Sequence, residues 1–306
     1  MKKQNKRGPG RPRLKPEPEI PILTGIIDNP KDEDNLIELK YNVTDDMKKI
    51  NNYFKNLASD ILIFKFDKTG ASIFATNHLS NNTVHVRIDG SKCVYYYCDK
   101  PRELKIKRSN LDKILCNLDQ QYIFISFILC KDDFDQKFNI ILNNIYSFEE
   151  TYKINLIVDY EESFDDKMFE EQDDYKIKFC LKGKFFKKIV NSTKFYQNKL
   201  TFQQIGDDGV LEIHYASSQS QVEAIISPEK KEIKSLQIEH SIKENEIFAV
   251  SVFYDALKAT SNTNISDELT FKLWVDKPLY VTAILNNGAI TFNIRIDIID
   301  YNKIDM

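Results

Sequence analysis

The feature that most constrains this chain is a pattern of one amphipathic helix followed by several short strands, which occurs four times. Four segments place apolar residues at helical spacing with polar residues on the opposite side. They are Thr44–Ala58, Ser109–Asp119, Lys184–Tyr196 and Val250–Asn262. Alternating runs punctuated by turn residues fill the intervals, and Asn286-Asn287-Gly288 between two such runs is a hairpin signal. A fourfold βαβββ repeat predicts an α+β protein of two similar domains, each with sheet on one side and two helices on the other.

Two breaks in composition divide the 306 residues. Six of the nine prolines lie within the first 30 residues, which have no helical or strand periodicity, so residues 1–34 are expected to form an extended tail. The segment Asp159–Asp174 holds nine acidic residues and one lysine, and such a run repels itself and packs poorly. Residues 160–174 are therefore expected to connect two domains, residues 35–159 and residues 175–306.

Charge is distributed unevenly along the chain. Residues 1–15 carry seven Lys/Arg and no acid, so a net charge of −3 for the whole chain leaves −10 on the remainder. The 42% of hydrophobic residues excludes a wholly disordered protein. The longest apolar run, Tyr122–Cys130, is far shorter than the roughly 20 residues of a membrane span. Five cysteines without a CxxC pair favour a reducing, intracellular compartment.

Signatures of catalysis are absent from the sequence. The four histidines are scattered without metal-ligand spacing, and there is no phosphate loop, GxSxG motif or nucleotide fingerprint. We therefore expect no catalytic residue, no cofactor and no metal. A nuclease that binds a metal through the acidic run is the alternative from the enzyme class.

Two long stretches resemble a known family. The segment Thr83–Ser126 and the C-terminal segment Phe253–Ile296, with its Asp276–Leu279 turn, resemble DNA sliding clamps of the proliferating-cell-nuclear-antigen (PCNA) type. The N-terminal Lys6–Lys15, KRGPGRPRLK, resembles the tail of divergent PCNA-like proteins of large cytoplasmic DNA viruses, the African swine fever virus type. The resemblance, which extends over residues 35–304, implies a DNA-clamp fold. Three subunits would form a ring with sheets outside and four helices per subunit lining the hole.

A clamp that slides needs attraction to phosphates without reading of bases, and lysines on solvated helix faces provide it. Lysines on the outer face of any single amphipathic helix are ordinary, but basic residues on all four helices of an acidic body favour contact with DNA. The candidates on and beside the helices are Lys48, Lys49, Lys55, Lys107, Arg108, Lys113, Lys184, Lys187, Lys188, Lys194 and Lys258.

The tail is a separate candidate for DNA binding. Gly10-Arg11-Pro12, flanked by Arg7 and Arg13, resembles an AT-hook, in which an extended backbone places arginine in the narrow minor groove of A·T tracts. Unselective attraction to phosphates and a nuclear-import signal are the alternatives.

The resemblance also implies that subunits join edge to edge, between a strand at Thr151–Asp159 and a strand at Gln221–Ser227. The alternation of the first strand, TYKINLIVD, is itself typical of an edge that pairs with another chain. The interface candidates are Thr151, Lys153, Asn155, Ile157, Gln221, Glu223 and Ile225.

A docking pocket for a partner's peptide is implied beside the connector and the C-terminal tail. Its candidates are His78, Leu79, Phe164, Met168, Phe169, Ile298 and Ile299. The simpler interpretation is that the connector's apolar residues only attach it to the sheet.

The sequence thus predicts a homotrimeric sliding clamp, a processivity factor for a DNA polymerase in viral replication and repair. Its expected partners are duplex DNA, further copies of itself, a polymerase and a ligase. It would act in a cytoplasmic viral factory or in the nucleus. The alternative is a clamp-derived transcription or architectural factor that binds DNA through its tail as a monomer.

Overall fold

The computed structural model describes most of the chain after residue 22. The described residues are 23–42, 45–77, 82–116, 118–133, 136–146, 148–158, 164, 166–169, 175–193, 199–205, 211–216, 221–226, 231–238, 247–262, 265–274 and 277–298. The AT-hook-like tail, with Arg7, Arg11 and Arg13, lies outside them.

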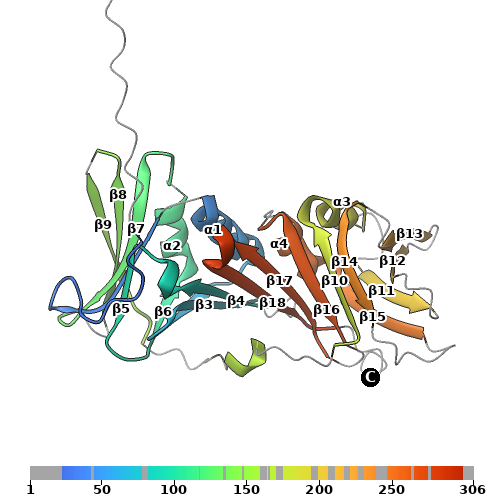
Figure 1. Cartoon of the computed structure of the whole chain (residues 1–306), viewed down its shortest axis with the longest axis horizontal. Helices are drawn as coiled ribbons and strands as arrows, with labels where there is room; N and C mark the ends of the chain where they lie inside the picture. Colours follow the sequence, from blue (N-terminus) through green and yellow to red (C-terminus); the bar gives the residue numbers. More distant parts are fainter. Residues whose placement is uncertain are drawn as a thin grey trace, which may run out of the picture.

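Within the described residues, eighteen strands form three antiparallel sheets (Figure 1). The first sheet has the order β5 (Tyr95–Cys98), β1 (Asn35–Asn42), β7 (Tyr122–Cys130), β8 (Lys137–Asn144) and β9 (Glu149–Asn155). The second has the order β14 (Ile233–Ile238), β10 (Ile177–Lys182), β16 (Glu268–Leu273), β17 (Leu279–Leu285), β18 (Ile290–Ile296), β4 (Asn82–Asp89), β3 (Gly70–Asn77), β2 (Ile61–Asp67) and β6 (Arg102–Lys107). The third has the order β13 (Gln221–Ile226), β12 (Leu211–Ala216), β11 (Lys199–Ile205) and β15 (Ile247–Phe253).

The two halves of the chain repeat one topology. In each half a strand precedes a helix, four strands follow, and a further strand, helix and three strands complete the unit. The sheet β5-β1-β7-β8-β9 of the first half corresponds to β14-β10-β16-β17-β18 of the second, and β4-β3-β2-β6 corresponds to β13-β12-β11-β15. The nine-stranded sheet therefore consists of five strands from the second half joined to four from the first. The junction is the antiparallel pair β18–β4.

The α-helices of the described residues lie on one side of the sheets, in the order α2, α1, α4, α3 along the molecule (Figure 1). They are α1 (Asp45–Leu57), α2 (Arg108–Leu115), α3 (Gly183–Thr193) and α4 (Tyr254–Asn262). Helix α1 illustrates why they form, because Met47, Ile50, Phe54 and Leu57 recur at helical spacing and all are buried.

Strand alternation places the core between the sheets and the helices. In β18 the even-numbered residues 290–296 are completely buried, and the odd-numbered ones face the other side of the nine-stranded sheet. In the second half, Phe271 stacks on Phe179 with ring centroids 4.8 Å apart and contacts Phe186 at 4.9 Å. These rings fill the space under α3.

The four predicted helices and the sheet-forming runs are confirmed, with shifted boundaries. Val250–Phe253 belong to strand β15 rather than to the fourth helix, because all four residues pair with β11. The second helix begins at Arg108, and Ser109 therefore lies in its first turn and does not cap it. The predicted Asn286–Gly288 turn is present, and positive φ angles at Asn286, Asn287 and Gly288 explain its Asn-Gly composition.

Truncation of Phe271 tests whether the stacked rings hold the second half together. We expect Phe271→Ala to lower the free energy of unfolding by about 3–5 kcal/mol, because it removes a fully buried ring and leaves a cavity. The measurement is urea denaturation followed by circular dichroism. Ile284→Ala, on the exposed side of β17, is the matched control and should change stability little. Equal losses in the two variants would contradict this account of the core.

Candidate nucleic-acid interface

The row of helices presents a basic surface. The described helices carry nine Lys/Arg and four Asp, although the chain beyond residue 15 has a net charge of −10. The side chains of Lys55, Lys113, Lys184, Lys188 and Lys258 are exposed, and those of Lys48, Lys49, Lys187 and Arg108 are half-buried. Lys107, the residue before α2, is exposed, and Lys194 lies outside the described residues. Positive charge therefore lies on all four helices, with the highest density on α3.

Direct bonds between side chains hold the helices in their row. The Asn51 amide of α1 donates to Asp112 Oδ1 of α2 at 2.9 Å, and Tyr53 of α1 lies 3.5 Å from Thr260 of α4. The amide of Asn82 in β4 donates to the carbonyl of Ala256 in α4 at 2.8 Å. Because the last two contacts join the first half of the chain to α4 of the second half, the charged surface of α1 and α4 has a fixed geometry.

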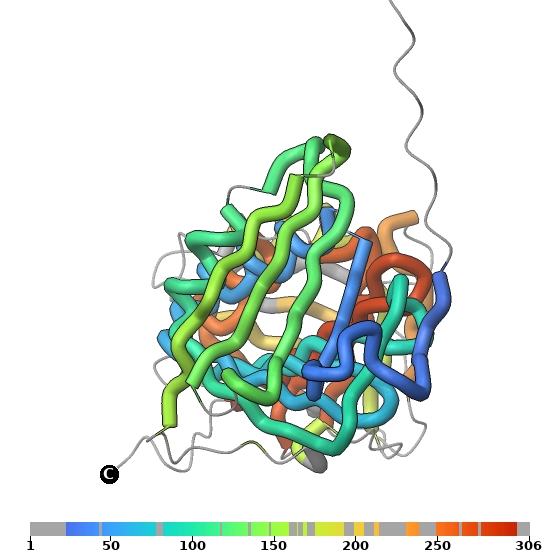
Figure 2. The backbone as a smooth tube through the Cα atoms, turned by 90° about the vertical axis from the view of Figure 1, so that its left-hand side faces the viewer, coloured from blue at the N-terminus to red at the C-terminus, as the bar shows by residue number. Residues whose placement is uncertain are grey.

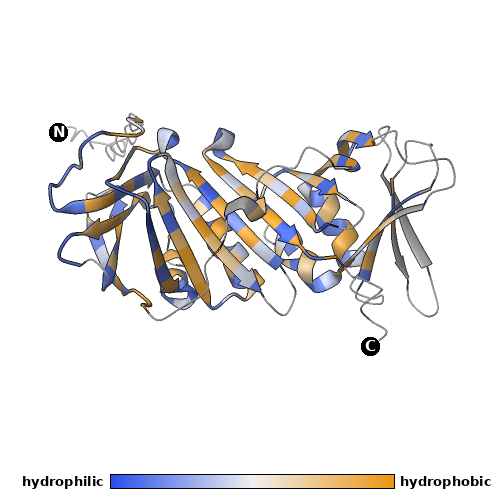
Figure 3. Cartoon of the chain, turned by 90° about the horizontal axis from the view of Figure 1, so that it is seen from below, coloured by the Kyte–Doolittle hydropathy of each residue, from blue (hydrophilic) through white to orange (hydrophobic). Residues whose placement is uncertain are grey.

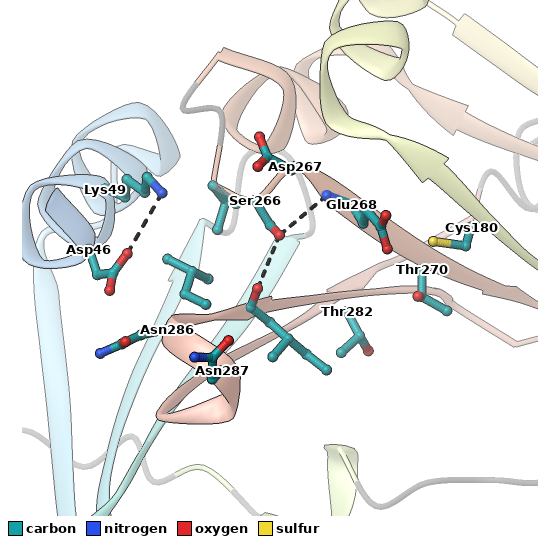
Figure 4. A pocket seen from close by; sticks show the side chains of 13 residues that line it. Asp46, Lys49, Cys180, Ser266, Asp267, Glu268, Thr270, Thr282, Asn286 and Asn287 are labelled. Carbon is teal, nitrogen blue, oxygen red and sulfur yellow. Dashed lines mark hydrogen bonds and ion pairs between the residues drawn. The ribbon is translucent and has the colours of Figure 1, made fainter. Parts of the chain in front are cut away.

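Among the predicted cations, Arg108 and Lys49 have contacts within the chain. Arg108 donates from Nε to the carbonyl of Ser59 at 2.7 Å, and Arg108 Nη1 lies 3.9 Å from Asp112 Oδ2. Lys49 Nζ lies 3.7 Å from Asp46 Oδ1, and both side chains border a cleft of about 410 Å³ between α1 and strands β10, β16 and β17 (Figure 4). Lys55, Lys184, Lys188 and Lys258 are more exposed to solvent than these two residues.

The interface candidates fall on two strands at opposite ends of the molecule. Strand β9 is the last strand of its sheet, and Figure 2 views the end that carries it. Strand β13 ends the four-stranded sheet at the other end (Figure 1). Thr151, Lys153 and Asn155 of β9 are exposed. For Gln221, Glu223 and Ile225 the structure describes the backbone, which lies in β13.

Ile157 has a different position from the other interface candidates. Strand β9 ends at Asn155, and the N–H of Ile157 donates to the carbonyl of Lys105 at 2.9 Å. This residue therefore covers part of the edge of β6 in its own chain. The segment around Ile26 covers β5 in the same way, through a parallel bridge to Tyr96.

Sequence reasoning missed a group of polar residues on the face of β9 that carries Glu150 and Tyr152. Tyr122 and Tyr152 both donate to the carboxylate of Glu150, at 2.9 and 2.5 Å. The hydrogen bond to Glu150, together with burial, raises the pKa of Tyr152 to about 12. The alternation of β9 indicates that positions 150 and 152 share a face, but the partner Tyr122 is 28 residues away in sequence from Glu150.

The connector residues that the structure describes, Phe164 and Asp166–Phe169, lie on the side of the nine-stranded sheet that is opposite the helices, and Figure 3 views this side. Phe164 is buried and stacks on Phe74 of β3 with centroids 5.8 Å apart, and Lys65 Nζ donates to its carbonyl. Phe169 contacts the rings of Phe74 and His85. The connector is thus attached to the sheet through its aromatic residues, as the simpler interpretation requires.

The peptide pocket stays a prediction. Met168 is half-buried, and its carbonyl accepts a hydrogen bond of 2.9 Å from Tyr280. Ile298 packs against the main core. The other three candidates, His78, Leu79 and Ile299, lie outside the described residues.

The described residues lack two features that would point to other functions. None of the helices there is long and apolar enough to cross a membrane. Among the same residues, no group of three or more His, Cys, Asp or Glu could hold a metal ion.

Comparison with solved structures identifies the fold. PCNA from Thermococcus kodakaraensis superposes with a TM-score of 0.72 over 86% of this chain and 100% of its own, at 12% identity. The chain has the fold of a PCNA-type clamp. A PCNA2–PCNA3 complex from Sulfolobus tokodaii matches over 85% of this chain and 98% of its own, with a TM-score of 0.69 and 15% identity. PCNA of A. fulgidus bound to the C-terminal region of FEN-1 matches over 86% of this chain and 98% of its own, with a TM-score of 0.66 and 15% identity.

Sequence comparison points to a viral relative, and no family model matches the chain. The chain is 23% identical over 307 residues to an uncharacterized protein of African swine fever virus (isolate Pig/Kenya/KEN-50/1950). The match covers 94% of this chain and 99% of that protein. Both resemblances expected from the sequence, to PCNA-type clamps and to a protein of this virus, are therefore confirmed.

Removal of one aromatic ring tests how the connector is attached. We expect Phe164→Ala to speed amide hydrogen exchange in residues 164–169 by at least tenfold while the core strands keep their protection, because the stack on Phe74 is lost. Val158→Ala, at an exposed apolar position before the connector, is the control and should leave exchange unchanged. Unaltered exchange in Phe164→Ala would mean that other contacts attach the segment.

Proposed function

We propose that this chain is a subunit of a homotrimeric sliding clamp that encircles duplex DNA and acts as a processivity factor for a DNA polymerase in viral replication and repair. The observation that carries the proposal is the junction between β18 and β4. In the topological repeat, β9 corresponds to β18 and β13 corresponds to β4. The chain therefore has, at its two ends, the same two strand edges that pair with each other in its middle.

Pairing of β9 with β13 of a second copy would repeat the internal junction between chains. An edge strand with unpaired N–H and C=O groups is a ready template for such pairing. The contact is head to tail, and contacts of this type form rings when the rotation closes. The row of helices would continue as well, because α2 of one copy would meet α3 of the next as α1 meets α4 within the chain.

The repeat also predicts the register of this pairing. For the β9 edge, the pair Phe127↔Ile140 of β7 and β8 corresponds to the pair Phe271↔Val281 of β16 and β17. Tyr152 pairs with Ile140, and Ile294 pairs with Val281, so Tyr152 corresponds to Ile294. For the β13 edge, the pair Ile73↔Val86 of β3 and β4 corresponds to the pair Ile213↔Ala224 of β12 and β13. Val84 and Val222 each lie two residues before the second member of these pairs, so they correspond to each other. Since Ile294 pairs with Val84 within the chain, Tyr152 should lie opposite Val222, and Thr151 opposite Glu223.

Electrostatics support duplex DNA as the ligand of the helix row. Lysines that contact phosphates bind with an energy that is nearly independent of sequence, as sliding requires. An acidic body disfavours DNA on the outer surfaces, so that attraction is confined to the helices. No catalytic group is needed for this role, and we propose a scaffold rather than an enzyme.

The solved relatives support the choice of partners. A PCNA2–PCNA3 complex is an association between clamp proteins, and the A. fulgidus PCNA was solved with the C-terminal region of FEN-1. By analogy we propose self-association of this chain and docking of a polymerase or ligase. The place of action, a cytoplasmic factory or the nucleus, belongs to the same proposal.

A disulfide between chains tests the ring and its register. Directly opposite residues of antiparallel strands have Cα atoms about 4.5–5.5 Å apart, a distance that a disulfide spans. We expect Thr151→Cys with Glu223→Cys, in a Cys116→Ser background, to give covalently linked trimers on oxidation. The out-of-register pair Asn155→Cys with Ile225→Cys, about 20 Å apart at 3.4 Å per residue, is the control and should not link.

Light scattering of the unmodified 35.8 kDa chain over a dilution series accompanies this experiment, with about 107 kDa expected for three copies. A chain that stays monomeric at high concentration and low salt would overturn the ring and favour a monomeric factor acting through the basic tail.

Charge reversal on α3 tests the DNA-binding surface. We expect Lys184→Glu with Lys188→Glu to reduce DNA-dependent stimulation of the polymerase at least tenfold without loss of the trimer, because four units of charge per subunit change beside the phosphates. Lys100→Glu with Lys231→Glu, at exposed sites outside the helices, makes the same change in net charge and serves as the control. Equal effects in the two pairs would remove the helices from the proposed interface.

A further inference from the structure

The turn between β8 and β9 carries three large apolar side chains that a single chain leaves exposed. Ile145 is 40% exposed, Tyr146 is 66% exposed and Phe148 is 58% exposed. They make up three of the eight exposed large hydrophobic residues in the described part of the chain. Such clustering within four residues differs from the scattered exposure that is ordinary on protein surfaces.

Hydrogen bonds fix the shape of this turn. The side-chain Oδ1 of Asn144 accepts from the N–H groups of Tyr146 and Phe148, both at 2.9 Å. The N–H of Asn144 donates to the carbonyl of Phe148 at 3.0 Å, and the N–H of Ile145 donates to the carbonyl of Gln121, in the turn before β7, at 2.7 Å. The apolar side chains are therefore presented by an ordered backbone, which reduces the entropy lost when a partner binds.

The topological repeat shows what a turn in this position does. Its counterpart is the turn between β17 and β18, which is held by the first half of the chain. Asn286 donates to the hydroxyl of Tyr41 in β1 at 2.6 Å, Lys92 Nζ donates to the carbonyl of Asn287 at 2.7 Å, and Asp89 at the end of β4 donates from its N–H to the carbonyl of Ala289 at 2.9 Å. This turn thus anchors the internal β18–β4 junction.

One residue makes the comparison sharper. With Tyr152 at the position of Ile294, Phe148 stands at the position of Ile290. Ile290 is completely buried beside β4, whereas Phe148 is left more than half exposed. Strand β4 of the same chain lies beside Ile290. The strand that would lie beside Phe148 in the same way has to come from a second molecule.

We propose that the β8–β9 turn is an aromatic anchor for self-assembly, with Tyr146 and Phe148 inserted against a second copy of this chain at the ends of its β10 and β13. Those ends correspond to the ends of β1 and β4 that hold the internal turn. The anchor is continuous with the β9 edge, and it rests on the proposed clamp function. Buried aromatic residues of this kind dominate the energetics of many protein interfaces.

A double substitution in the turn tests the anchor. We expect Tyr146→Ser with Phe148→Ser to raise the concentration at which the assembly half-dissociates by about 10–100-fold, the range of an interface hot spot. Sedimentation equilibrium over a dilution series measures it. The monomer should keep its stability, because both residues are exposed in it. Ile284→Ser, at a 58% exposed position on β17, is the matched control and should leave assembly unchanged.

A second variant reports on burial directly. In a Trp274→Phe background, Phe148→Trp becomes the sole tryptophan, and its emission should shift to the blue as the protein assembles on concentration. Emission that stays at the wavelength of a solvated tryptophan in the assembled protein would overturn the anchor, and so would unaltered assembly of the double variant.

These outcomes separate the two proposals. If the unmodified chain never assembles, the clamp proposal fails and the anchor fails with it. If the unmodified chain forms trimers and the turn variants assemble equally well, only the anchor is overturned, including the case in which the turn binds DNA or another protein instead.

Discussion

Antiparallel pairing between β18 and β4 is the interaction on which the rest of this structure depends. It joins five strands of the second half to four strands of the first, and it buries Phe292 and Ile294 of β18 beside Val84 and Val86 of β4. Without it each half would expose an apolar sheet edge, which is a liability for any soluble protein. The helices α1 and α4 meet above this junction, and Phe164 and Phe169 of the connector pack on the opposite side of the same sheet.

The duplication pairs two strand edges in the middle of the molecule, but it leaves the corresponding edges at the two ends without a partner strand in the described part of the chain. Each half has an edge of the β9/β18 type and an edge of the β4/β13 type. Within the chain, β18 pairs with β4. Strand β5 is covered by the segment around Ile26, and β6 is partly covered by Ile157. At β9 and β13, no strand pairs with the outer edge in the part of the chain that the structure describes. A head-to-tail contact between copies is the simplest way to pair both edges with one interface.

Helical periodicity was sufficient to predict the four helices, because each buries a stripe of large residues. Their ends were less predictable, since local preference and pairing compete there. At Val250–Phe253 a run that fits a helix stripe is drawn into β15 by its ladder with β11. The apolar residues of the connector indicate that it is attached to the sheet, but the partner of Phe164, Phe74, is far away in the sequence and has no local signal. The β8–β9 turn was missed for another reason, since sequence patterns place polar residues in turns and Asn144–Phe148 is mostly apolar.

The distribution of charge follows from the same geometry. The connector residues that the structure describes, Phe164 and Asp166–Phe169, lie on the side of the nine-stranded sheet away from the helices and their lysines. Exposed charges on opposite sides of the sheet that lie more than about 8 Å apart are largely screened from one another at physiological ionic strength. A chain of net charge −3 can therefore carry nine Lys/Arg against four Asp on its described helices, while the remainder of the sequence beyond residue 15 holds the excess of acid.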